Sequence, residues 1–188
     1  IWNNGPIFAI ICLAFLANLT AFPITHGLMP YIAKDILLLD ENGLGQLLAA
    51  FSCGAVMGSL ILAATPSQKY ATQLMLINLV IWYIMLAIFS WIDSRTGALV
   101  VLFFVGIAHS FAMTSMSVSL LGFTNELVRG RVMGVRVLAI YGVPLGLLAS
   151  GFLIEYFGYL SFMYMYVVLG ILVTVIIGAK WRSSIWHT

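Results

Sequence analysis

Long apolar runs alternate with short polar connections along the whole chain, and this alternation predicts the fold. Six runs are long enough to cross a hydrocarbon core about 30 Å thick at about 1.5 Å per helical residue. We place these spans at 7–33, 44–65, 70–92, 97–124, 132–154 and 160–181. The 8 basic and 6 acidic residues fall in the connections or within about a turn of them. The pattern therefore predicts an all-α integral membrane protein with six transmembrane helices.

The composition agrees with this fold class. The chain is 63% hydrophobic and 7% charged, against about 25% charged residues in a soluble domain. A net charge of +2, with the basic residues at span ends, does not favour a nucleic-acid partner. The chain begins with Ile1 and shows no signal peptide, so we expect a piece of a longer protein.

The basic residues are distributed unevenly between the two sides of the predicted membrane domain. With a cytoplasmic N-terminus, two basic residues lie in the outer connections, Lys34 and Arg95, and six lie on the inner side. The inner six are Lys69, Arg129, Arg131, Arg136, Lys180 and Arg182. Because Lys and Arg accumulate on the cytoplasmic side, the count predicts that both termini are cytoplasmic.

Stretch 125–158 combines much of this charge with a regular spacing of small residues. Its basic loop motif consists of Glu126, Arg129, Gly130 and Arg131. We interpret these arginines mainly as determinants of topology, with a surface pairing to Glu126 worth at most about 1 kcal/mol. The apolar run that follows predicts a membrane helix that packs closely against another helix.

The first three spans and the last three form a near-repeat. Spans two and five each carry a ladder of small residues, which lets another helix approach closely. The ladders are Ala50, Gly54 and Gly58 in span two, and Gly142, Gly146 and Ser150 in span five. Spans one and four instead carry polar stripes, Asn18, Thr25 and His26 in one and His109, Met113 and Ser117 in the other. The pattern predicts two three-helix units, and the stripes are candidates for binding a small, partly apolar substrate.

The polar candidates also have purely structural interpretations. His109 is predicted near the membrane midplane, where an ionisable side chain indicates function, yet a neutral histidine bonded to a neighbouring helix carbonyl fits equally well. Asn18 is suited to binding substrate or to bridging helices, and His26 to helix packing. Proline and glycine near the end of span one allow either a flexible gate or a static kink.

Other kinds of chemistry find little support in the sequence. We find no nucleophile frame for an intramembrane protease and no Walker loop, so we predict neither an enzyme nor a bound cofactor. Cys12 and Cys53 lie in apolar runs, where cysteine behaves as a small hydrophobe. The His and Cys residues do not have metal-ligand spacing, so no metal site is predicted.

Several motifs, taken in order, resemble the major facilitator superfamily, most closely its bacterial drug and siderophore exporter branch. The motifs in the second half are Glu126-x-x-Arg129-Gly130-Arg131-Val132-Met133-Gly134, Gly142-x-Pro144-Leu145-Gly146 and Tyr156-Phe157-Gly158. Spans one and two are similar to the seventh and eighth helices of that branch. Their residues are Pro6, Ala14-Phe15-Leu16, Pro23, Pro30-Tyr31, Gly43-x-Gly45 and Ala49-Ala50-Phe51-x-x-Gly54-Ala55-x-x-Gly58. The resemblance covers essentially the whole chain and implies a C-terminal half.

The resemblance implies a secondary transporter that moves a small molecule by alternating access. It implies a fold of two inverted three-helix repeats, completed by a second six-helix half to give twelve helices. Spans one and four would line the cavity, and the small-residue ladders of spans two and five would pack against the other half. We expect a multi-pass protein of the bacterial inner membrane, in contact with lipid and more suited to export.

Two departures from the family pattern bear on these expectations. The charged loop motif expected between the eighth and ninth helices is reduced to 65–70, and span five has Pro144 without a later glycine pair. An alternative function is a non-transporting accessory subunit of a larger membrane complex. A second six-helix half against spans two and five would support transport, whereas an unrelated subunit, pigment or lipid there would support the accessory role.

Overall fold

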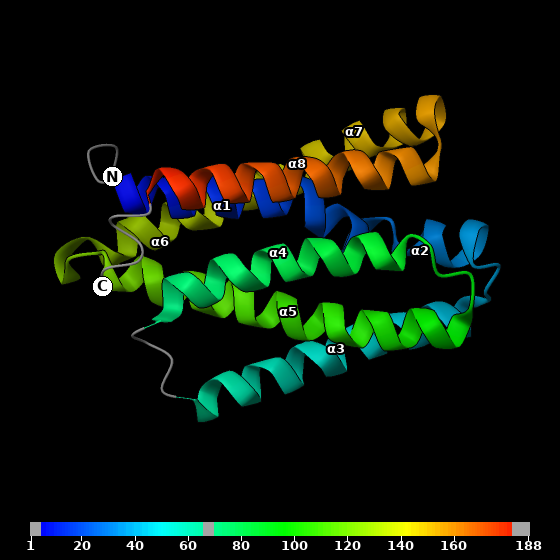
Figure 1. Ribbon diagram of the computed structural model, residues 1–188, viewed down its shortest axis with the longest axis horizontal. Helices are drawn as coiled ribbons and strands as arrows, with labels where there is room; N and C mark the ends of the chain where they lie inside the picture. The colour runs from blue at the N-terminus through cyan, green and yellow to red at the C-terminus, as the bar shows by residue number, and fades with distance from the viewer. Residues whose placement is uncertain (1–4, 66–69, 182–188) are drawn as a thin grey trace.

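The computed structural model describes residues 5–65 and 70–181 (Figure 1). Both parts are almost entirely helical. The expected connection at 66–69, which contains Lys69, and the basic tail residue Arg182 lie outside the described residues.

The first membrane segment is a helix with two π-helical turns near its end. The helix α1 (Gly5–Phe22) is followed by η1 (Pro23–Gly27), the short α2 (Met29–Tyr31) and η2 (Ile32–Ile36). Pro23 has no amide hydrogen to donate within the helix, and the Leu28 amide donates to the Pro23 carbonyl at 2.8 Å. The wider turn therefore coincides with this proline.

Five further segments complete the bundle. They are α3 (Glu41–Ala64), α4 (Ala71–Phe89), α5 (Arg95–Gly122), the run η4 (Glu126–Val128), α6 (Arg129–Leu138), η5 (Ala139–Tyr141) and α7 (Gly142–Phe157), and α8 (Tyr159–Lys180). In the described part of the chain, six helical segments are long and apolar enough to span a membrane. The predicted all-α class with six transmembrane helices is confirmed.

The fifth segment begins earlier than its apolar run suggests. Its helical run starts at Glu126, whereas the sequence placed the span at 132–154 and treated the preceding residues as a loop. The Asn125 side chain accepts a hydrogen bond from the Leu127 amide at 3.2 Å, which caps the first turn. The basic motif is therefore helical, and Arg136 lies within the helical run that continues to Phe157.

The connections between helices follow ordinary capping chemistry. Asp40 caps α3 by accepting from the Gly43 amide at 2.8 Å, and Ser94 caps α5 by accepting from the Gly97 amide at 3.2 Å. Gly158 turns the chain from α7 into α8 with a φ of 80°, a conformation that glycine adopts without a Cβ clash.

The helices pack as two interlocked groups of three. In one group α5 lies against α3 and α4, and in the other α1 lies against α7 and α8, while α4 and α8 join the groups (Figure 1). Exchanging α1, α3 and α4 for α5, α7 and α8 maps these contacts onto one another. Because α1 and α5 run in opposite directions, the two triplets are inverted repeats.

Within each group, the glycines of one ladder let two helices approach closely. A Cβ on Gly54 would collide with the Phe103 carbonyl of α5, and one on Gly146 would collide with the Leu19 carbonyl of α1. Gly58 and Gly142 have similar neighbours on the same two helices, α5 and α1. Close backbone approach through small residues is the expected packing device inside a membrane.

These contacts correct the expectation that the ladders face a second half. The four glycines meet helices of their own chain, Ser150 is fully buried, and Ala50 packs partly buried against the core. The small residues lie where α3 meets α5 and where α7 meets α1, which are contacts between the first three spans and the last three. The outer faces of α3 and α7 instead carry large exposed side chains, such as Leu60 and Leu148.

Candidate functional site

A pocket of about 660 Å³ lies between α1, α5 and the α6–α7 segment. Its lining residues come from α1, η1, α5, α6, η5 and α7. Its polar lining residues are Asn18, His26, Arg136 and Tyr141. The remaining lining is apolar and includes Met113. A mostly apolar cavity with few converging polar groups is typical of a small-molecule site.

Three of the six predicted cavity residues line this pocket. They are Asn18, His26 and Met113, which come from α1, η1 and α5. The half-buried Asn18 donates from its side-chain amide to the Ala14 carbonyl at 2.8 Å. That bond uses one amide hydrogen on its own helix and leaves further hydrogen-bonding capacity in the side chain.

Thr25, also predicted, lies behind the pocket and positions His26. The Thr25 hydroxyl oxygen is fully buried and 2.9 Å from Nδ1 of His26, whose ring is exposed. Phe22 stacks on the His26 ring at 5.2 Å between centroids. The imidazole is thus held at the pocket wall by a hydroxyl on one edge and an aromatic ring on one face.

Arg136 and Tyr141 are polar lining residues that were not predicted for the site, and Arg136 carries a charge. Its half-buried guanidinium donates from Nη2 to the Met113 carbonyl at 3.3 Å. The hydroxyl of Ser117, the sixth predicted cavity residue, donates to the same carbonyl at 3.0 Å. Ser117 therefore lies beside the pocket and shares an acceptor with Arg136.

A signal for Arg136 was present in the sequence. The residue lies inside the expected span 132–154, and an ionisable side chain within a membrane segment is a functional candidate by default. Grouping it with the loop arginines hid this position, because those residues end up elsewhere: Arg131 is exposed, and Arg129 pairs with Glu126 at 3.2 Å.

His109 does not line the pocket as expected. Its ring is surrounded by Phe22, Phe51 and Trp82, with centroid distances of 5.3, 5.3 and 4.8 Å, and by His26 at 6.3 Å. Both ring nitrogens are buried without a hydrogen-bond partner among the described residues. His109 therefore belongs to an aromatic cluster behind His26, and the alternative bond to a helix carbonyl does not form either.

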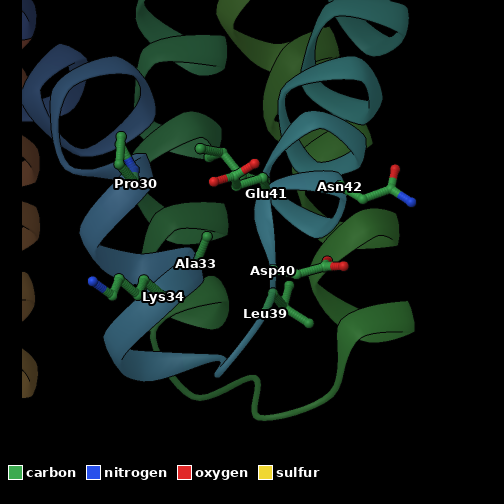
Figure 2. A pocket seen from close by; sticks show the side chains of 8 residues that line it. Pro30, Ala33, Lys34, Leu39, Asp40, Glu41 and Asn42 are labelled. Carbon is green, nitrogen blue, oxygen red and sulfur yellow. The ribbon is translucent and has the colours of Figure 1, made fainter.

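A second pocket, of about 590 Å³, lies at the opposite end of the bundle between η2 and the start of α3. Its charged residues are Lys34, Asp40 and Glu41, and their side chains point apart (Figure 2). Asp40 is already committed to capping α3. Because its charged groups do not converge, this pocket is a weaker candidate.

The structure was also searched for side chains that could bind a metal ion together. Over 5–65 and 70–181, no group of three or more His, Cys, Asp or Glu side chains is placed to hold a metal ion.

Six spans in inverted triplets beside a mostly apolar pocket define a polytopic membrane protein. The family model of the Major Facilitator Superfamily matches residues 8–184. The chain belongs to this superfamily, whose members move small molecules across membranes and are not enzymes. No curated protein and no solved structure matches the chain.

Proposed function

We propose that this chain forms the C-terminal half of a secondary transporter that exports a small molecule by alternating access. The observation that carries the proposal is the pocket in which Asn18, His26, Met113 and Arg136 converge from four helical elements. In this proposal the pocket is one wall of the substrate cavity.

Two features of the pocket support a transport pathway. An arginine inside a membrane segment is costly unless it faces protein or a water-filled path, and Arg136 faces the pocket. The wall of α1 also continues into the π-helical turn that carries His26. Single π-helical turns within α-helices are frequent at functional sites.

The proposal requires a second six-helix unit on the open side of the pocket. Large apolar side chains on α3 and α7, such as Leu60 and Leu148, are more than half exposed and available for that contact or for lipid. We place both termini in the cytoplasm of a bacterial cell, following the distribution of Lys and Arg. Family membership favours this function over an accessory subunit.

Alternating access is tested by the accessibility of one pocket position from both sides of the membrane. Val137 lines the pocket and is 64% exposed, so Val137→Cys is prepared in the full-length protein after Cys12 and Cys53 are replaced by alanine. A membrane-impermeant maleimide is applied to right-side-out and everted vesicles. We expect labelling from both sides, with a ratio that changes when a proton or sodium gradient is imposed.

The matched control is Val175→Cys, which is 54% exposed but lies on the apolar face between α4 and α8. It should stay unlabelled from either side because lipid covers it. Labelling of Val137→Cys from one side only, whatever gradient is imposed, contradicts alternating access. Export itself requires that energised everted vesicles accumulate the substrate and that right-side-out vesicles do not.

A further inference from the structure

Arg136 carries a positive charge that the described part of the chain does not neutralise. The acidic residues of the chain lie at helix ends or in connections. The ion pair that the described residues form joins Arg129 and Glu126, and Arg136 takes no part in it. A guanidinium in such a position faces protein, a backbone carbonyl or a water-filled cavity, so in this pocket Arg136 presents its charge to an anionic ligand.

The hydrogen bonding of Arg136 leaves most of its donors for such a partner. A guanidinium has five N–H donors in a rigid planar fork. The structure shows one bond, from Nη2 to the Met113 carbonyl. That bond anchors the group to α5, while the remaining donors suit the paired oxygens of a carboxylate or phosphate.

The side chains around Arg136 indicate the chemical character of the rest of the ligand. The same pocket is lined by the apolar side chains of Phe22, Met116 and Ile140. Its volume of about 660 Å³ lies within the range of small-molecule sites. An anionic group bound at Arg136 would therefore carry an apolar or aromatic body.

We propose that Arg136 makes this pocket selective for amphipathic organic anions. The inference rests on the proposed transport function and names its substrate class. The anion binds the free edge of the guanidinium, and its apolar body lies against the hydrophobic wall. The same negative group is offered by a soluble carboxylate and by an anionic lipid headgroup; we commit to the soluble compound.

The test compares two probes that differ in charge and little in shape, 2-naphthoate and the neutral 2-naphthamide. The full-length protein is placed in nanodiscs of phosphatidylcholine, so that no anionic lipid competes, and binding is measured by calorimetry. We expect naphthoate to bind about 10-fold or more tightly than naphthamide, since a hydrogen bond to a charged group is strong.

The variants assign the preference to this one side chain. Arg136→Met should weaken naphthoate binding about 10-fold or more and leave naphthamide binding unchanged, whereas Arg136→Lys should retain part of the preference. The matched control is Arg131→Met, which removes an exposed arginine from the same helix and should bind naphthoate like the wild type.

Several results overturn the proposal. They are no naphthoate binding to the wild type, equal binding of both probes, or unchanged binding to Arg136→Met. Loss of naphthoate binding in nanodiscs containing phosphatidylglycerol assigns the site to a lipid headgroup and overturns the soluble ligand. If Arg136→Met leaves naphthoate binding intact while the Val137→Cys labelling still alternates, transport stands and the anion site fails.

Discussion

The hydroxyl oxygens of Thr20 and Tyr83 lie 2.7 Å apart in the buried interior of the bundle. Thr20 donates its own hydrogen to the Leu16 carbonyl at 2.8 Å, so Tyr83 is the donor between the two. This hydrogen bond links α1 to α4 and thereby ties one packing group to the other. The ring of Tyr83 fits against Gly170 of α8, where a Cβ would collide with it.

Removing this hydroxyl should therefore weaken the joint between the two groups. In Tyr83→Phe, the Thr20 oxygen loses its donor while the ring still fills its site. Hydrogen bonds between membrane helices contribute about 0.6 kcal/mol on average, so we expect a loss of about 1 kcal/mol or less in the free energy of unfolding. Reversible unfolding of the purified protein in detergent measures it. Tyr156→Phe, at a position 76% exposed, is the control and should leave stability unchanged.

The small-residue ladder gives a second prediction with an internal control. Replacing glycine by alanine within a helix ordinarily adds up to about 1 kcal/mol of helix stability. Gly54→Ala should instead destabilise the protein, because its Cβ would collide with the Phe103 carbonyl. Gly151 lies in α7 with open space where a Cβ would be, so Gly151→Ala should be neutral or stabilising.

Thermal unfolding of Gly54→Ala, Gly151→Ala and the wild type measures these effects. If Gly54→Ala melts at or above the wild-type temperature, α3 and α5 do not approach at this position as closely as described. If Gly151→Ala is the less stable variant, that face of α7 is covered by another chain or segment.

Much of the fold could be predicted because hydrophobic length and charge placement determine it directly. The six apolar runs had to become helices, since a membrane offers no other partner for their backbone groups. The break near Pro23 was also visible, because proline removes a donor. The start of the fifth segment was missed, since capping by Asn125 is a local hydrogen bond that hydropathy does not report.

The site was harder to predict because it depends on which faces of the helices meet. Sequence spacing placed Gly54 and Gly146 on close-packing faces, but only the tertiary contacts show that those faces meet α5 and α1 of the same chain. Likewise, His109 and Met113 share a stripe four residues apart. Met113 lines the pocket, while the His109 ring lies among aromatic side chains from three other elements.

Topology is tested at the helix ends. Asn125 directly precedes the fifth segment, whose α6 lies at the same end of the bundle as the start of α1 and the end of α8, and Asp93 connects α4 to α5 at the other end (Figure 1). In protein without Cys12 and Cys53, a membrane-impermeant maleimide added to intact cells should label Asp93→Cys and spare Asn125→Cys. Permeabilised cells provide the control, since both variants should then react. The reverse pattern would place both termini outside.

His109 lies in the aromatic cluster formed with Phe22, Phe51 and Trp82. An imidazole with both nitrogens buried and unpaired pays the cost of desolvation without a compensating hydrogen bond, typically about 1–3 kcal/mol. Phenylalanine has a ring of similar size and no polar atom to satisfy, and it retains edge-to-face packing with Phe22 and Trp82. If the ring is structural, His109→Phe should be at least as stable as the wild type, by up to about 1 kcal/mol, and transport should keep its rate and pH dependence.

A second variant separates packing from chemistry at the same position. His109→Gln keeps hydrogen-bonding groups but removes both the ring and the ability to titrate, so a structural role predicts that it is less stable than His109→Phe and transports with an unchanged pH profile. The measurements are the pH dependence of transport and the free energy of unfolding of both variants. Loss of pH dependence in both variants, with stability preserved in His109→Phe, would show that the imidazole exchanges protons during transport and that it reaches the pocket in another conformation.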